Sequence, residues 1–273
     1  MTSALQVKQV YKVFGRDRAS IGQALQLARA GTGKEAVLER TGCTLGVNNV
    51  SMDIKQGEIY VIMGLSGSGK STLVRHLNRL VEPTAGEIWI NGQNIVALDD
   101  AALREVRRRQ ISMVFQSFAL LPHKTAAENI TFGLLVRGED ARRSRAKAEE
   151  WINGKLNLKG FSDKYPDELS GGMRQRVGLA RALVGETDVV LLDEAFSALD
   201  PLIRCEMQDV LLTIQRKLKK TIVFITHDLD EAVKIGSRIA IMKDGAVIQE
   251  GSPDDILNRP VDDYVRRFVD RRG

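Results

Sequence analysis

One segment of the chain combines closely spaced glycines with a lysine and a serine, a pattern that can bind phosphate. Residues 64–71 read Gly-Leu-Ser-Gly-Ser-Gly-Lys-Ser, between an apolar segment and a helix-forming one. The glycines let the backbone curl so that successive N–H groups point at phosphate oxygens, and the positive N-terminus of the following helix faces the same anion. Lys70 adds a full charge for the β- and γ-phosphates, and the Ser71 hydroxyl can ligate Mg²⁺. A flexible glycine turn is the alternative for a lone match, but the flanking strand and helix favour a phosphate-binding loop.

Two carboxylates follow a second apolar segment. Residues 189–192 read Val-Val-Leu-Leu, and Asp193 and Glu194 come directly after them. A buried strand would deliver Asp193 to a Mg²⁺ ion. Glu194 faces another way and can act as the general base that polarises an attacking water. A core strand with a solvated acidic end would explain the pair taken alone, but the phosphate-binding segment earlier in the chain favours the catalytic interpretation.

A second pair of glycines indicates that two chains share one nucleotide. Ser170, Gly171 and Gly172 precede residues 177–184, which are predicted to be helical. They would form another anion-binding helix N-terminus beside the one that the phosphate loop provides. Two such sites for one nucleotide make sense when each nucleotide lies between two copies of the chain. A capped helix that binds no ligand is the alternative.

His227 is one of three histidines, and it stands between Thr226 and Asp228 at the end of an apolar segment. In α/β sheets, ligands bind at the carboxyl ends of the parallel strands, where such a loop would lie. A neutral imidazole in this place can donate a hydrogen bond to a γ-phosphate oxygen. A structural or surface role is the alternative for a lone histidine.

The elements that must position these groups alternate between strands and helices, which predicts an α/β fold. Apolar or alternating segments predict strands at 5–14, 44–57, 58–63, 86–90, 111–115, 189–192, 221–225, 239–242 and 246–249. Helical spacing predicts helices at 70–80 and 99–109, a helical hairpin at 16–42, a highly charged helical region at 125–166 and a helix end at 264–273. The pairs Asn91-Gly92 and Asp244-Gly245 predict tight turns.

The composition excludes several classes of protein. The 273 residues include 40 Lys+Arg and 35 Asp+Glu, a net charge of +5, and 43% are hydrophobic, which excludes disordered and collagen-like chains. Two cysteines, Cys43 and Cys205, cannot form a disulfide framework and favour a reducing compartment. No apolar segment has the length of a membrane span, and residues 1–11 lack a secretory signal, so we expect a soluble, cytoplasmic chain, which would dock through partners if it works at a membrane.

Taken in order, the motifs resemble those of the ATP-binding cassette (ABC) ATPases, and the resemblance covers nearly the whole chain. It implies a P-loop NTPase core with a mixed sheet, an antiparallel β subdomain and an inserted α-helical subdomain. It implies a single ABC domain over residues 1–273, in which 1–116 and 174–273 form the RecA-like core and the β subdomain, and 117–173 form the α-helical signature subdomain. ATP and Mg²⁺ are the expected cofactors.

The resemblance also implies a role for each matching residue. Glu194 is the expected catalytic glutamate, His227 the switch histidine, and Gln116 the glutamine that senses Mg²⁺ and water. The expected Mg²⁺ ligands are Ser71, Gln116 and Asp193. The expected ATP-binding residues are Phe14, Gly64, Leu65, Ser66, Gly67, Ser68, Gly69, Lys70, Ser71 and Thr72. The ATP held by a partner subunit is expected to contact Ser170, Gly171, Gly172 and Gln175, and Asp200 belongs to the D-loop.

Three further assignments have open alternatives. In this family an aromatic near the end of the first strand packs on adenine, and Phe14 fits that position better than Tyr11, although either ring could belong to the core. The apolar run at 117–123 would suit a partner helix or form a buried hinge. Four arginines near the end of the sequence could touch anionic lipid or form a solvated helix end: Arg266, Arg267, Arg271 and Arg272.

Longer stretches resemble the ATPase subunits of glycine betaine/proline betaine (quaternary amine) importers, among them IMGLSGSGKSTLVRHLNRLVEPT, YPDELSGGMRQRVGLARAL and IVFITHDLDEAVKIGSRIAIM. The insertion at 16–42 agrees with that subfamily, as does Ala195, where many ABC proteins have proline. This resemblance implies ATP hydrolysis that powers uptake of osmoprotectants at the cytoplasmic face of the inner membrane. The implied partners are a second copy of the chain, transmembrane permease subunits and, indirectly, a substrate-binding protein.

Two alternatives to this function remain. The cargo could be choline, carnitine or another compound, since the ATPase does not touch it. A soluble ABC ATPase that acts on DNA or ribosomes is the other alternative, but the basic residues are not interleaved with aromatics, so no nucleic-acid partner is expected. Many members of the subfamily continue into a tandem CBS module; the sequence ends at Gly273, so regulation through such a module is not carried over.

Overall fold

The computed structural model describes residues 2–115, 119–185, 187–197 and 199–270. They form two compact units: unit 1 contains the chain up to Asp99 and from Val223 onward, and unit 2 contains Asp100–Ile222. The predicted signature subdomain, 117–173, falls within unit 2, and its boundaries stay a prediction. No helix among the described residues has both the length and the apolar character that a membrane crossing requires.

Unit 1 contains an antiparallel sheet, as predicted. Its strands are β1 (Ser3–Phe14), β2 (Thr44–Lys55), β4 (Ala85–Ile90) and β5 (Gln93–Asn94), in the order β2-β1-β4-β5. Asn91 and Gly92 both have positive φ, 48° and 79°, which confirms the tight turn between β4 and β5. The buried side chains of β1 alternate near its end, where Tyr11 and Val13 point into the core.

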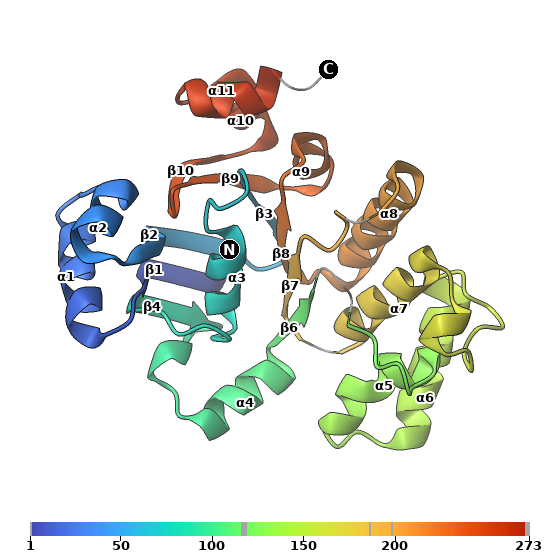
Figure 1. Ribbon diagram of the computed structural model, residues 1–273. Helices are drawn as coiled ribbons and strands as arrows, with labels where there is room; N and C mark the ends of the chain where they lie inside the picture. Colours follow the sequence, from blue (N-terminus) through green and yellow to red (C-terminus); the bar gives the residue numbers. More distant parts are fainter. Residues whose placement is uncertain (1, 116–118, 186, 198, 271–273) are drawn as a thin grey trace. The chain divides into compact units, whose positions relative to one another are not determined.

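The helical hairpin predicted at 16–42 is confirmed as α1 (Arg18–Arg29) and α2 (Lys34–Thr41). Asp17 begins α1 because its side chain accepts a hydrogen bond from the Ser20 N–H at 2.9 Å, and Gly42 ends α2 in the left-handed conformation. Figure 1 shows the hairpin beside β1 and β2. Its apolar side packs against them in one buried cluster that contains Ala24, Ala28, Val37, Tyr11, Val13, Cys43 and Leu45.

A second sheet of unit 1 carries the phosphate-binding segment. In it β10 (Ala246–Gly251), β9 (Arg238–Lys243), β3 (Ile59–Met63) and β8 (Thr221–Thr226) are neighbours in this order. Strand β9 pairs parallel with β3 and antiparallel with β10, so the sheet is mixed, as predicted. The turn Asp244-Gly245 between β9 and β10 is confirmed by positive φ at both residues.

The helices of unit 1 differ in part from expectation. Helix α3 (Lys70–Leu77) ends three residues before the predicted position, because Asn78 leaves the helical conformation and Arg79 has a φ of 56°. The sequence signal used for this end was Pro83, which restricts the residue before it but does not require the helix to reach it. Helices α9 (Leu229–Ile235), α10 (Pro253–Asn258) and α11 (Asp263–Asp270) complete the unit, together with a short 3₁₀ turn at Ile95–Ala97.

Unit 2 combines two parallel strands with helices. Strand β6 (Ile111–Val114) pairs parallel with β7 (Val189–Asp193), and α4 (Asp100–Arg109) precedes β6. Helices α5 (Ala126–Val136) and α6 (Ala141–Glu150) pack together, and α5 also packs on α7 (Gly171–Leu183) (Figure 1). A π-helical turn at Trp151–Lys155 and a 3₁₀ turn at Pro166–Glu168 lie between α6 and α7. The longest described helix, α8 (Pro201–Leu218), was not predicted.

Candidate nucleotide site

The phosphate-binding segment joins β3 to α3, in the strand–loop–helix arrangement that the sequence predicts. Gly64, Gly67 and Gly69 all have positive φ, at 155°, 78° and 100°. A Cβ on Gly64 would lie 2.4 Å from the Met242 carbonyl oxygen, and one on Gly69 would lie 2.4 Å from the Gly46 carbonyl oxygen. Only glycine fits these positions, because strands β9 and β2 lie too close to the loop for a side chain.

The Lys70 side chain is buried in this loop. Its ammonium donates to the carbonyl oxygens of Gly64, at 2.9 Å, and Leu65, at 3.1 Å. Gly69, the residue before α3, supplies no capping side chain. A phosphate at the N-terminus of α3 would therefore meet the dipole of the helix and the Lys70 charge together. Ser71 and Thr72 lie in the same first turn.

Contacts from distant parts of unit 1 hold the loop, and sequence reasoning did not find them. The Tyr264 hydroxyl of α11 accepts a hydrogen bond from the Leu65 N–H at 3.4 Å and donates to the Met242 carbonyl at 3.3 Å. The Gly245 N–H donates to the Ser68 carbonyl at 2.9 Å. Burial raises the pKa of Tyr264, which keeps the hydroxyl neutral and able to do both. The Ser68 hydroxyl oxygen is buried and has no hydrogen-bond partner among the described residues.

The two candidate adenine-stacking rings have different surroundings. Phe14 is 44% exposed, and a Cβ on Gly46 would lie 2.7 Å from its ring and 3.6 Å from the Thr72 methyl group, so ring and helix N-terminus are close. Tyr11 is 7% exposed and belongs to the buried cluster under the helical hairpin. Phe14 is therefore the ring available for stacking, whereas Tyr11 is a core residue. The difference follows from the alternation of side chains along β1, in which Tyr11 and Val13 are buried and Phe14 is exposed.

His227 lies in the short connection between β8 and α9, where its side chain is exposed. The Thr226 side chain before it is buried and accepts a hydrogen bond from the Asp228 N–H at 3.0 Å. Asp228 then begins α9, since its carboxylate accepts from the Glu231 N–H at 3.1 Å. Two side-chain hydrogen bonds thus fix the backbone on the C-terminal side of His227, and the imidazole stays accessible.

The acidic pair lies at the end of β7 in unit 2. Asp193 is buried and is the last residue of the strand, whereas Glu194 is half-buried and has a φ of 48°. This left-handed conformation costs free energy in a residue with a side chain. The Ser197 hydroxyl and N–H both donate to the Glu194 carbonyl, at 2.9 and 3.2 Å, and stabilise it. The chain therefore bends sharply at Glu194, directly after the strand that ends with Asp193.

The second glycine segment lies at the N-terminus of α7. Ser170 is exposed, and its side chain accepts a hydrogen bond from the Met173 N–H at 3.3 Å. Arg174 holds the preceding backbone by donating to the carbonyls of Pro166 and Leu169, at 3.2 and 2.9 Å. Gln175 is buried, and its side-chain oxygen has no hydrogen-bond partner among the described residues. Ser170 is thus open to a ligand, whereas Gln175 lies inside the unit.

Asp200 begins α8, since its carboxylate accepts from the Ile203 N–H at 3.0 Å. Arg204 donates to the carbonyls of Ser197 and Leu199, at 3.4 and 3.2 Å, and so ties the D-loop to the helix. Gln116 lies outside the described residues, as do Ser117, Phe118 and Ala198 of the neighbouring motifs.

The protein groups suit Mg²⁺ only together with a phosphate ligand. Among the described residues, no three His, Cys, Asp or Glu side chains gather as a metal site. Mg²⁺ keeps several waters and is usually bound by one or two protein groups plus substrate phosphates, so a site without such a cluster is compatible with it. Asp193 and the Ser71 hydroxyl supply oxygen donors of the required kind.

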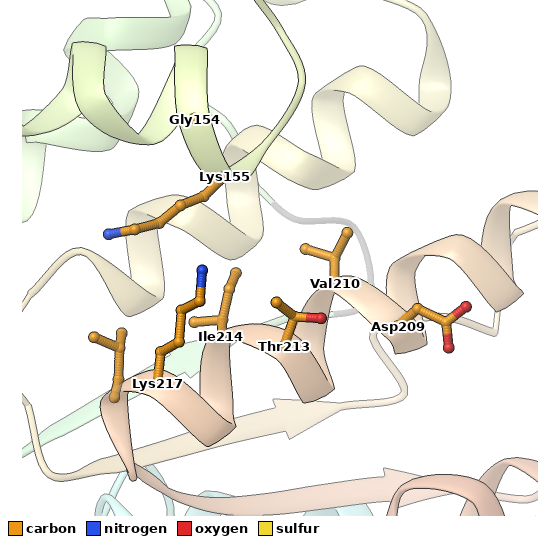
Figure 2. A pocket seen from close by; sticks show the side chains of 8 residues that line it. Gly154, Lys155, Asp209, Val210, Thr213, Ile214 and Lys217 are labelled. Carbon is orange, nitrogen blue, oxygen red and sulfur yellow. The ribbon is translucent and has the colours of Figure 1, made fainter.

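A pocket in unit 2 contains none of these residues. It has a volume of about 240 Å³ and lies between the π-helical turn and the second half of α8. In Figure 2, Lys155 and Lys217 extend into this space from the two elements, and Asp209 lies at the other end. Lys155 is paired with Glu150 at 3.2 Å and lies over the Trp151 ring, so its charge is already compensated.

The comparisons with known proteins find a matching family model and similar sequences. Residues 47–197 match the sequence model of the family described as "ABC transporter". The chain is 56% identical to the glycine betaine/proline betaine transport system ATP-binding protein ProV of Escherichia coli, over 98% of this chain and 66% of that protein. It is 49% identical to the trimethylamine N-oxide transport system ATP-binding protein TmoW of Pelagibacter ubique, over 97% of this chain and 76% of that protein. The chain therefore spans just under two thirds of the length of the Escherichia coli relative.

A solved structure shares the fold. It is a dimeric structure of the ATP-binding cassette MJ0796 bound to ADP and Pi, with a TM-score of 0.75 and 32% sequence identity over 91% of this chain and 98% of that chain. The predicted fold, a P-loop ABC ATPase core with a mixed sheet, an antiparallel sheet and inserted helices, is confirmed.

Proposed function

The chain belongs to the ABC transporter family, and from that membership we propose that it is the ATP-hydrolysing subunit of a membrane importer. The observation that carries the proposal is that the chain has two helix N-termini suited to an anion, that of α3 after the phosphate loop and that of α7 after Ser170. The first has the lysine and the glycines of a nucleotide site, whereas at the second Ser170 and Gly171 are exposed and no lysine stands among residues 165–175. Such a second terminus suits a nucleotide brought by another molecule.

In the proposed site, each residue has a chemical task. The curled loop and Lys70 bind the β- and γ-phosphates, and Phe14 stacks on adenine. Mg²⁺, when held by Ser71, Asp193 and Gln116, neutralises charge on the phosphates. Glu194 takes a proton from the attacking water, and His227 donates a hydrogen bond to a γ-phosphate oxygen.

We propose that two copies complete each site. Ser170, Gly171, Gly172 and Gln175 of one copy would contact the ATP held by the phosphate loop of the other, and Asp200 would belong to the D-loop. The MJ0796 cassette, a dimer with bound ADP and Pi, supports this arrangement. ATP would favour the closed pair because it binds both surfaces, and hydrolysis would release them.

The proposed setting is the cytoplasmic face of the inner membrane, on transmembrane permease subunits served by a substrate-binding protein. Glycine betaine or proline betaine is the proposed cargo, on the strength of the similarity to ProV. The similarity to TmoW keeps another methylated amine as a second candidate. Uptake of labelled glycine betaine, proline betaine, choline, carnitine and trimethylamine N-oxide, in cells with and without the chain, distinguishes them.

The shared site is tested by association in solution. In a Glu194→Gln background, MgATP should convert the chain from monomer to dimer in analytical ultracentrifugation. Adding Ser170→Arg should abolish the dimer and leave ATP affinity unchanged, because the substitution blocks only the surface offered to the other copy. Adding Lys70→Ala should abolish both binding and dimer. A Ser170→Arg protein that still dimerises with ATP would contradict the proposal.

A further inference from the structure

The helical hairpin formed by α1 and α2 has no task in the proposed mechanism, and it precedes the residues that match the family model. It nevertheless reaches the phosphate loop. Lys34, the first residue of α2, donates a hydrogen bond from its ammonium to the Gly67 carbonyl oxygen at 3.3 Å. The loop is therefore contacted by two ammonium groups, one from Lys70 within the motif and one from the hairpin.

The hairpin holds the backbone of Lys34 in a fixed place. Val37, one turn further along α2, is fully buried, and Ala24 and Ala28 bury the facing side of α1. The Val37 N–H donates to the Gly33 carbonyl at 3.0 Å, which anchors the first turn of α2 on its preceding residue. A long side chain that begins from a packed helix loses less conformational entropy on binding than one on a free loop.

The Gly67 carbonyl, which Lys34 contacts, belongs to a peptide group inside a tight turn of the phosphate loop. Gly67 has a φ of 78°, and the next N–H, that of Ser68, donates to the Leu65 carbonyl at 3.2 Å and closes a tight turn in the loop. An ammonium on the Gly67 carbonyl pins the same peptide group from the other side. It also places a positive charge beside a loop that would bind a triphosphate, where it would attract the anion.

We propose that Lys34 is a positioning residue of the nucleotide site: the hairpin supplies a second ammonium that fixes the Gly67 peptide and favours nucleotides with more phosphates. This inference rests on the proposed function, since it requires the loop to bind ATP. In the part of the chain that the structure describes, Lys34 makes no ion pair with a carboxylate that would cancel its charge.

The test compares three substitutions in the full chain, with ATP, ADP and AMP affinities measured by isothermal titration calorimetry in the presence of Mg²⁺. Lys34→Ala should weaken ATP binding by about three- to fivefold, the size expected for a partly exposed charge, and AMP binding by less. Lys34→Arg should restore the affinity, because it keeps the charge and the donor. Arg40→Ala is the matched control, since it removes a positive charge from the last turn of the same helix, and it should leave all three affinities unchanged.

Each other outcome has a definite meaning. Equal losses of affinity for ATP and AMP, or no rescue by arginine, would show that Lys34 only supports folding. Thermal unfolding of the variants would then show a loss of stability. If Lys34→Ala binds ATP like the wild type while Lys70→Ala does not, the inference about the hairpin is wrong and the proposed function stands. If neither substitution weakens ATP binding, the proposed function itself fails.

Discussion

The N-termini of α3 and α7 both suit an anion, but they are built in different ways. The loop before α3 is shaped by its own unit: Gly64 and Gly69 have no room for a side chain, Lys70 is buried, and Tyr264 of α11 holds the Leu65 N–H. The N-terminus of α7 is held by its cap, Ser170, and by the hydrogen bonds of Arg174 to the preceding backbone, and a Cβ on Gly171 would meet no atom within 4 Å. The first N-terminus is enclosed by its own unit, whereas Gly171 at the second is open, as the proposed contact with another copy would require.

The largest expected effect concerns chemistry at the end of β7. Glu194→Gln should lower the rate of ATP hydrolysis by about 10²–10⁴-fold, because it removes the proposed general base and keeps the size of the side chain. ATP affinity should stay unchanged, since the phosphate loop is intact. Phosphate release and equilibrium binding measure the two quantities separately.

Asp209→Asn is the matched control for this substitution, since Asp209 is an exposed carboxylate on α8 of the same unit. It should hydrolyse ATP at the wild-type rate. Hydrolysis at the wild-type rate by Glu194→Gln would remove Glu194 from the mechanism and would leave the binding loop as it is.

Substituting alanine for Gly69 and for Gly171 tests the difference between the N-termini of α3 and α7. Gly69→Ala should destabilise the fold by about 2–4 kcal/mol, because φ is 100° and the new Cβ would lie 2.4 Å from the Gly46 carbonyl oxygen. Gly171→Ala should change stability by less than about 1 kcal/mol, since alanine suits the first turn of a helix and meets no neighbour. Urea unfolding of the two proteins gives the difference directly.

ATP-dependent dimerisation gives a second test of the difference between the two helix N-termini. In a Glu194→Gln background, Gly171→Ala should bind ATP normally and weaken ATP-dependent dimerisation, because the space it fills is the space left for the other copy. If Gly171→Ala unfolds as readily as Gly69→Ala, the N-terminus of α7 is constrained by its own chain and the contrast between the loops is wrong.

Features that depend on neighbouring residues could be predicted from the sequence, whereas contacts between residues far apart in the chain could not. The phosphate loop, the turns at Asn91-Gly92 and Asp244-Gly245 and the helical hairpin were predictable, because glycine conformation and helical spacing are local properties. The contacts of Tyr264 with Leu65 and of Lys34 with Gly67 join residues 199 and 33 positions apart, and no local pattern encodes them. Helix α8 is a different case, since Asp200 and Pro201 form a recognisable start signal that was not used.

The smallest effect concerns pH and the rigidity of α3. His76 is fully buried on this helix, and its Nδ1–H donates to the Val81 carbonyl at 2.6 Å, while Nε2 has no hydrogen-bond partner among the described residues. Burial lowers the pKa of His76, with a further lowering by Lys12, against raising effects of the Val81 carbonyl and Glu82. The folded protein therefore keeps His76 neutral at a pH where the unfolded chain already binds a proton.

Because the unfolded state binds more protons below the ordinary histidine pKa of about 6.5, His76 should make the protein less stable as the pH falls from neutral through that value. His76→Gln cannot bind a proton, and its amide can still donate to the Val81 carbonyl. The drop in Tm between pH 7.5 and pH 5.5 should therefore be smaller in this variant than in the wild type, by on the order of 2 °C. An equal drop in both proteins would mean that water reaches the His76 imidazole. Helix α3 would then be packed less closely than its comparison with α7 assumes.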